Sequence, residues 1–144
     1  MSDAATLLNV TVSHVSPMLS YVPHSLWWDE TNLNSNIQEN YSLKSCHATD
    51  ASLGQGSVSL QWYGQGGTVY GGYRQRLGSF NVTLDNTTNS FLGFKDGDAE
   101  ILPDVLFTAS NLTLGHHLVT LTNTGSSERN ATLDIDRVSA IRRW

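Results

Sequence analysis

The sequence has few charged residues: Asp, Glu, Lys and Arg make up 15% of its 144 residues, with 13 acidic against 8 basic side chains. The longest basic run is Arg142-Arg143. Such a chain lacks a cationic surface for a phosphate backbone, so we do not expect nucleic acid as a partner. Long hydrophobic runs are lacking too. No stretch reaches the ~18 apolar residues of a membrane-spanning helix, so no span is expected within this chain.

Cysteine is nearly absent, since Cys46 stands alone and cannot form an internal disulfide. A single thiol is typical of a reducing compartment. We expect Cys46 to be a small buried hydrophobic residue. A chain of this length can bury a core without disulfides or metals, so we predict one domain over residues 1–144.

Glycosylation motifs, in contrast, are frequent. Six of the eleven asparagines stand in Asn-x-Ser/Thr, whereas the Ser and Thr content would give about two by chance under this rule. The excess favours a glycosylated domain that is secreted or displayed at the cell surface. The predicted glycosylation sites are Asn9, Asn40, Asn81, Asn86, Asn111 and Asn130.

The two ends of the sequence carry no targeting signal. The first residues, Met1-Ser2-Asp3-Ala4-Ala5, have neither the basic nor the apolar region of a signal peptide. The last residues, Ile141-Arg142-Arg143-Trp144, follow directly on a strand-like segment. We therefore expect a module of a longer secreted or membrane-anchored precursor.

Short alternating or β-branched segments recur every ~8 to 12 residues, which is typical of a β-sandwich or barrel. Turn signals rich in Gly, Asn and Asp separate them, and one long irregular stretch runs from Pro23 to Asn40. The sequence therefore predicts an all-β antiparallel sandwich. The predicted strands are Thr6–Ser13, Met18–Val22, Ser42–Ala48, Ser57–Tyr63, Thr68–Tyr73, Ser79–Leu84, Ser90–Phe94, Val105–Ala109, His117–Thr122 and Ala131–Ala140.

The alternation also assigns side chains to the two faces of each strand. Asp134 and Asp136 alternate with core residues and are expected to point to solvent or to an end loop. Trp27 and Trp28 are neighbours in extended chain, so one is expected in the core and the other exposed. The predicted core is Leu8, Val10, Val58, Leu60, Trp62, Val69, Phe80, Val82, Leu84, Phe107, Val119, Leu121, Leu133 and Ile135.

A series of motifs covers most of the chain in a fixed order. The series begins with Asn9-Val10-Thr11-Val12 and Ser45-Cys46-His47-Ala48-Thr49. It continues with the segments 56–71, 80–85, 114–123 and 133–138. It resembles extracellular proteins of fungi, mainly mushroom-forming species, with an N-terminal galactose-binding-domain-like β-sandwich. Members commonly have acidic residues where Ser13-His14 stand here.

The resemblance implies a jelly-roll sandwich similar to carbohydrate-binding modules, acting as a non-catalytic, lectin-like ectodomain that contacts fungal wall or environmental glycans. Sugar binding needs an aromatic plate for the ring, with carboxylates, amides or guanidinium groups for the hydroxyls. Two parts of the sequence offer these groups, the long irregular stretch and the strands around the glycine-rich turn. The candidate residues are Trp28, Asp29, Glu30, Tyr63, Tyr70, Tyr73, Arg74 and Arg76.

Other functions remain open at this point. A structural or protein-interaction ectodomain would use the same polar strands and glycans without binding sugar. A glycoside-acting enzyme would need two carboxyl groups at a fixed separation, for which Asp29 and Glu30 are candidates. No cofactor is expected, although a structural Ca²⁺ held by Asp134 and Asp136 is a weak alternative. The histidines lack zinc-ligand spacing.

Overall fold

The computed structural model describes residues 7–31, 41–73, 77–93, 101–125 and 131–143. These residues form eleven strands and two short 3₁₀ helices. Among them there is no helix long and apolar enough to cross a membrane. The elements are β1 (Leu7–Ser13), β2 (Leu19–Val22), η1 (His24–Leu26), β3 (Trp27–Glu30), η2 (Ser42–Lys44), β4 (Cys46–Asp50), β5 (Ser57–Tyr73), β6 (Ser79–Leu84), β7 (Thr87–Leu92), β8 (Ile101–Ala109), β9 (Gly115–Asn123), β10 (Thr132–Ile135) and β11 (Arg137–Arg143).

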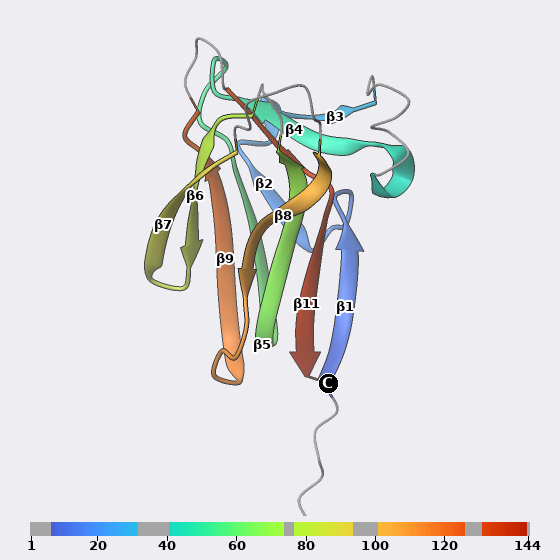
Figure 1. Ribbon diagram of the computed structural model, residues 1–144, viewed down its shortest axis with the longest axis vertical. Helices are drawn as coiled ribbons and strands as arrows, with labels where there is room; N and C mark the ends of the chain where they lie inside the picture. The colour runs from blue at the N-terminus through green and yellow to red at the C-terminus, as the bar shows by residue number, and fades with distance from the viewer. Residues whose placement is uncertain (1–6, 32–40, 74–76, 94–100, 126–130, 144) are drawn as a thin grey trace, which may run out of the picture.

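Strand β5 belongs to both layers of a β-sandwich (Figure 1). Its first half pairs with β2 and β9, and its second half pairs with β11 and β8. The sequence predicted two strands separated by a glycine turn, but the strand is continuous. At the bend, Gly64 lies directly against the backbone of Ile141. This close approach requires a glycine, because the Cβ of any other residue would clash with the Ile141 carbonyl oxygen.

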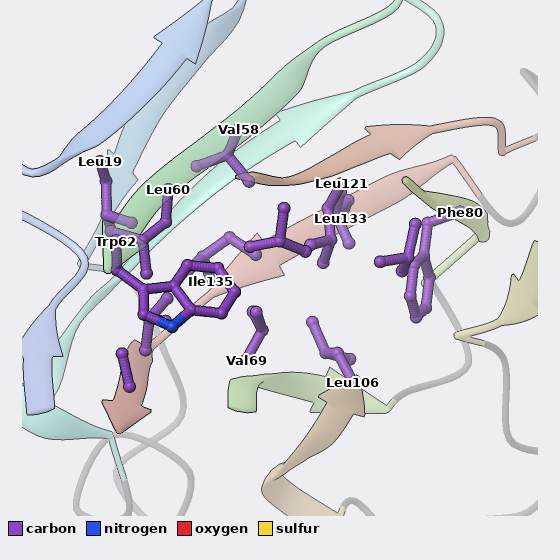
Figure 2. Packing of buried hydrophobic residues seen from close by; sticks show 14 of the residues in the cluster. Leu19, Val58, Leu60, Trp62, Val69, Phe80, Leu106, Leu121, Leu133 and Ile135 are labelled. Atoms are coloured by element: carbon purple, nitrogen blue, oxygen red, sulfur yellow. The ribbon is translucent and has the colours of Figure 1, made fainter. Parts of the chain in front are cut away.

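The two layers enclose one hydrophobic core (Figure 2). One layer has the order β2, first half of β5, β9, β6, β7, and the other has β1, β11, second half of β5, β8. Leu60 from the first layer and Val69 and Val138 from the second line the same internal cavity of about 10 Å³. A void of that size holds at most one water, so the core is closely packed.

A third sheet, which we call the end sheet, closes the top of the sandwich in Figure 1 and has the order β10, β4, β3. Its inner face carries Trp27 and Leu133 into the core. The stretch predicted as irregular therefore contains a strand, β3; its residues 32–40 lie outside the described part. The single strand predicted over 131–140 is two strands in different sheets, divided at Asp136.

Most of the predicted core is confirmed. Phe80 and Ile135 are completely buried, and Trp62 and Trp27 are nearly so. Leu8, in contrast, is 39% exposed, because it lies near the start of β1, the edge strand of its layer. Three other predicted core residues are half-buried at the margin: Val10, Leu84 and Phe107. Cys46 is buried as expected.

Candidate functional site

The edge strand of the end sheet carries three of the predicted sugar-binding residues. Trp27 faces the core, so the alternation of β3 turns Trp28 to the outer face, where it stands opposite the small Ala48. Trp28 is half-buried, and its indole N–H donates a hydrogen bond to a carboxylate oxygen of Glu30 at 3.3 Å. This contact holds an aromatic ring beside a carboxylate.

Asp29 is held at the same edge by His47 on the neighbouring strand. The two residues are cross-strand partners, with 2.7 Å between Asp29 Oδ1 and His47 Nδ1. The imidazole stacks on Trp27, with ring centroids 5.8 Å apart, and contacts Tyr21 at 4.2 Å. The Asp29 side chain is 56% exposed. A carboxylate anchored on one oxygen and open to solvent is suited to accept hydrogen bonds from a ligand.

Tyr21 packs against the rings of Trp27 and His47. Its hydroxyl donates to the carbonyl oxygen of His14 at 2.6 Å. Burial raises the pKa of Tyr21 well above its usual value, and the charges of Asp29 and Cys46 add to the effect. The phenol therefore stays protonated as a hydrogen-bond donor at every physiological pH.

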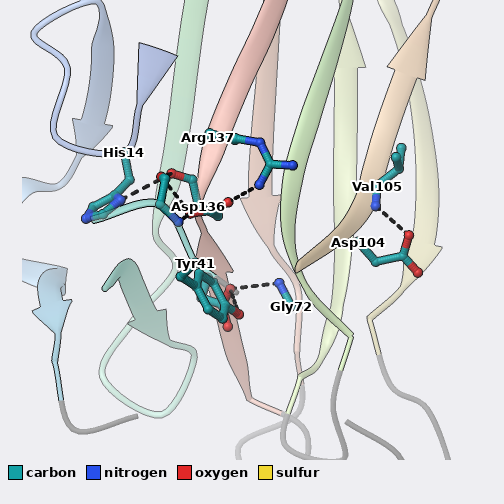
Figure 3. Close-up of polar contacts among 9 residues, drawn as sticks. His14, Tyr41, Gly72, Asp104, Val105, Asp136 and Arg137 are labelled. Atoms are coloured by element: carbon teal, nitrogen blue, oxygen red, sulfur yellow. Dashed lines mark hydrogen bonds and ion pairs between the residues drawn. The ribbon is translucent and has the colours of Figure 1, made fainter. Parts of the chain in front are cut away.

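Asp134 continues the Trp28 row across the end sheet, since Trp28 pairs with Ala48 and Ala48 pairs with Asp134. Of the two alternatives predicted for Asp134, solvent or an end loop, the first is wrong, because Asp134 is 1% exposed. One of its carboxylate oxygens accepts the Tyr41 hydroxyl at 3.0 Å and the Gly72 amide at 2.8 Å (Figure 3). Residues distant in sequence therefore cover this part of the outer face.

Solvent is likewise wrong for Asp136, which is completely buried. Its carboxylate accepts the Ser42 amide at 2.7 Å and the Ser42 hydroxyl at 2.8 Å, and pairs with the Arg137 guanidinium (Figure 3). The donors occupy lone pairs that a cation would need. Among the described residues, no three His, Cys, Asp or Glu side chains gather as a metal site.

The remaining predicted sugar contacts are not joined to Trp28. Tyr63 lies opposite His116, with ring centroids 4.9 Å apart, near the bend of β5 at the other end of the sandwich. Tyr73 ends β5, but its side chain lies outside the described part, as do Arg74 and Arg76. The structure thus brings Trp28 and Glu30 together on one face of β3, places Asp29 on the other face at the same edge, and leaves Tyr63 apart.

Three further residues organise these surroundings and were not predicted as site residues. His14 is completely buried, donates from Nδ1 to the Asp136 carbonyl at 3.2 Å and contacts the Ser45 hydroxyl at 3.1 Å. Tyr41 sits on Asp134, and Arg137 stacks over the Tyr70 ring. No local pattern indicates these contacts, because each partner is more than 25 residues away in sequence.

The described glycosylation motifs lie on the surface. Asn9, Asn86 and Asn111 are exposed, and Asn81 is half-exposed on the outer face of β6. Asn86 belongs to the two-residue loop between β6 and β7 that the sequence predicted as a turn. Glycans at these four positions would extend into solvent. Asn40 and Asn130 lie outside the described residues, and glycan occupancy stays a prediction.

A titratable pair, His117 and Asp85, connects the loop after β6 with the loop before β9 at the end of the sandwich opposite the end sheet. His117 contacts Asp85 through Nδ1 at 2.8 Å and the Thr113 carbonyl through Nε2 at 2.7 Å. Both partners are acceptors, so the doubly protonated imidazolium satisfies both contacts. The hydrogen bond with Asp85 raises the pKa of His117, and the same bond lowers the pKa of Asp85.

The melting temperature is therefore expected to be highest between about pH 4 and 6.5, the ordinary pKa values of the two groups. It should fall above pH 6.5, as His117 loses its proton through its raised pKa, and again below pH 4, as Asp85 gains one through its lowered pKa. Thermal unfolding from pH 3 to 9 measures this. The variant His117→Gln should lose the decline above pH 6.5; an unchanged decline would contradict the assignment.

The architecture defines the class of protein: an all-β antiparallel sandwich of the jelly-roll type. No protein-family profile matches the sequence, and no curated protein matches it as a relative.

Several solved structures share this fold. A family two carbohydrate esterase from Cellvibrio japonicus aligns with 95% of the chain at 9% identity and a TM-score of 0.55. A two-domain esterase active on acetylated mannans, co-crystallised with mannopentaose, aligns with 94% at 8% identity and a TM-score of 0.61. An exo-β-1,3-galactanase from Phanerochaete chrysosporium aligns with 91% at 15% identity and a TM-score of 0.50. The chain spans 34%, 37% and 29% of these proteins, respectively, and the likeness concerns the fold.

Proposed function

We propose that this protein is a non-catalytic carbohydrate-binding domain whose site is the outer edge of the end sheet. The observation that carries the proposal is the arrangement on β3. There the Trp28 ring is held by its hydrogen bond to Glu30 on the outer face, and the Asp29 carboxylate is exposed on the opposite face of the strand at the same sheet edge. The sandwich folds of carbohydrate-acting proteins give this assignment its context.

The chemistry of the site fits a sugar ring. The apolar face of a pyranose packs on an indole, because its C–H groups meet the electron-rich face of the ring. Carboxylates accept hydrogen bonds from hydroxyl groups and fix the orientation of the ring. Asp29 and Glu30 supply such acceptors on two sides of the strand. A single shallow contact of this kind gives modest affinity, so display in several copies would strengthen binding.

We place this domain outside the cell, where it meets wall or environmental glycans. The six glycosylation motifs and the four described ones at the surface support this placement. The resemblance to fungal ectodomains supports it as well. A domain that binds no sugar under the tests below would instead be a structural or protein-interaction ectodomain.

Replacing Trp28 by alanine is expected to abolish glycan binding and to lower the melting temperature only slightly, because Trp28 is half-buried and faces away from the core. The measurement is isothermal titration with the best ligand from a polysaccharide screen, together with thermal unfolding. Trp28→Phe is the matched control, since it keeps an aromatic plate and should retain part of the affinity. Full binding by Trp28→Ala would exclude this site, and turnover lost in Asp29→Asn or Glu30→Gln would favour an enzyme.

A further inference from the structure

A narrow slot lies between the two layers of the sandwich, on the side where β1 and β2 are the edge strands. The opposite side is closed, because Phe91 on β7 packs edge-on against Phe107 on β8, with ring centroids 6.2 Å apart. The enclosed volume of the slot is about 10 Å³, which admits a group the size of one oxygen atom and excludes a sugar ring. The described lining is apolar apart from Trp62 and Arg142, and includes Val10, Val12, Met18 and Ala140.

The indole N–H of Trp62 is a buried hydrogen-bond donor at this slot. Trp62 is 3% exposed, and its Nε1 has no acceptor among the described residues. The indole edge next to Nε1 faces the second layer, since Cζ2 lies 3.4 Å from a Cβ built on Gly67, the cross-strand partner of Ala140. Figure 2 shows the nitrogen on the side of the ring away from Leu60. A buried N–H without an acceptor costs free energy, so a ligand oxygen in the slot would be stabilised there.

Trp27 is the other buried tryptophan whose Nε1 has no acceptor among the described residues. That nitrogen lies 3.0 Å from a Cβ built on Gly56, and the Thr49 hydroxyl oxygen is closer still, at 2.6 Å from the same point. Trp27 lines neither the slot nor the core cavity. Close packing therefore leaves no room for a ligand at Trp27, in contrast to Trp62.

A positive charge borders the same slot. Arg142 is half-buried and is the charged residue among the described residues that line the slot. Its side chain faces inward because it follows Val138 and Ala140 at a period of two along β11. A guanidinium has several N–H donors and matches the geometry of a carboxylate. With the Trp62 N–H beside it, the slot fits a carboxylate group, one oxygen at each donor.

Apolar side chains at the mouth of the slot remain in contact with solvent. Val10 and Val12 on β1 are half-buried although they line the slot, and Met18, in the turn before β2, is 37% exposed. The flexible methionine can repack around an inserted chain, and covering these groups removes apolar surface from water. A glycan on Asn9 would leave the mouth open, because Asn9 points to the outer face and accepts a hydrogen bond from Ser139.

We propose that the slot binds a free aliphatic carboxylic acid of medium chain length. The carboxylate meets the Arg142 guanidinium and the Trp62 N–H, and the chain lies in the groove between β1 and Met18. From Leu8, the cross-strand partner of Arg142, the strand runs about 13 Å to Val12, close to the length of such a chain. This site goes beyond the proposed function: it shares no residue with the Trp28 site and takes another class of ligand, so each can fail without the other.

The test is isothermal titration of the purified domain with sodium octanoate below its micelle concentration. Acetate keeps the head group without the chain, and 1-octanol keeps the chain without the charge. We expect both to bind at least about tenfold more weakly than octanoate, because each lacks one half of the interaction. Octanoate should also shift the indole N–H signal of Trp62 in a ¹⁵N spectrum, a signal that Trp62→Phe assigns by its loss.

Two variants of the slot have matched controls elsewhere on the surface. Arg142→Gln should weaken octanoate binding about tenfold and leave 1-octanol unchanged, whereas Lys44→Gln removes a positive charge from an exposed residue and should change neither. Met18→Gln makes the mouth polar and should weaken both ligands. Val15→Gln alters an apolar side chain in the same turn that is 55% exposed, and should bind like the wild type. All four side chains are exposed or half-buried, so the variants should fold.

Weaker octanoate binding by Arg142→Gln and Met18→Gln, with normal binding by both controls, supports the slot. Unchanged octanoate binding by either slot variant, or equal weakening by its control, overturns the proposal, because the acid would then bind elsewhere. Absence of octanoate binding by the wild type overturns it as well. Trp28→Ala should bind octanoate normally, so none of these results decides the proposed function.

Discussion

Replacing Asp136 by alanine is expected to cost about 3–5 kcal/mol of unfolding free energy, the range for removing one partner of a buried ion pair. The carboxylate is completely buried and holds three donor groups, namely the Ser42 amide, the Ser42 hydroxyl and the Arg137 guanidinium. Alanine would leave these donors without their acceptor. Because the total unfolding free energy of a small domain is only about 5–15 kcal/mol, this variant should be barely stable enough to fold.

Urea denaturation of wild type and variants measures the loss. Asp136→Asn is the control, since its amide oxygen still accepts from Ser42 while the charge opposite Arg137 is gone. It should fall between wild type and alanine. A loss below about 1 kcal/mol for Asp136→Ala, the size expected of a surface ion pair, would contradict the structural role assigned to this carboxylate.

Replacing Gly64 by alanine is expected to destabilise the protein by about 3 kcal/mol or more, because overpacking against backbone is relieved only if the strands separate. A Cβ at this position would clash with the carbonyl oxygen of Ile141 on β11. Gly64 also lies at the bend where β5 passes from one layer to the other. The substitution would therefore disturb both layers of the sandwich at once.

Its cross-strand partner, Gly115, provides the control. A Cβ built on Gly115 has the Thr113 carbonyl as its nearest neighbour at 3.9 Å, which is ordinary contact. Gly115→Ala should therefore change the unfolding free energy by less than about 1 kcal/mol, with either sign. Equal stability of the two variants in urea denaturation would show that Gly64 is not needed for the bend.

Much of the fold could be predicted from alternation alone. The segment Ser79–Leu84 was predicted with the bounds observed for β6, and Phe80 and Val82 face the core as expected. Trp27 and Trp28 divide between core and surface for the same reason. Such predictions succeed where one face of a strand is buried and the other is wet, since the side-chain period of two then reports burial directly.

Alternation failed at Asp134 and Asp136, where the face opposite the core is also covered. The covering groups, Tyr41, Ser42 and Gly72, are about 60 to 95 residues away in sequence. Polar residues mark a strand face as wet by default, but a carboxylate with several donors is stable when buried. A local pattern contains no information about such partners, so these carboxylates were assigned to solvent or to an end loop.

The candidate site was likewise predicted in part. Trp28, Asp29 and Glu30 are consecutive, so any extended conformation keeps them together on one strand. Tyr63 was predicted as part of a second group near the glycine-rich turn, and it lies at the opposite end of the sandwich from Trp28. The distance between Tyr63 and Trp28 depends on the order in which the strands pair, and this order depends on the bend of β5. A local sequence pattern does not contain that information.

The central claim is that the domain binds glycans through the edge of the end sheet, and one measurement tests it most directly. The purified domain is passed over immobilised β-glucan, mannan, galactan, xylan and chitin in monomeric and bead-displayed form, with and without EDTA, beside Trp28→Ala. The EDTA arm decides whether calcium takes part. The account predicts selective retention of the wild type that is lost in Trp28→Ala. Absence of retention on every polysaccharide, even with bead display, would contradict it and leave a protein-interaction ectodomain as the function.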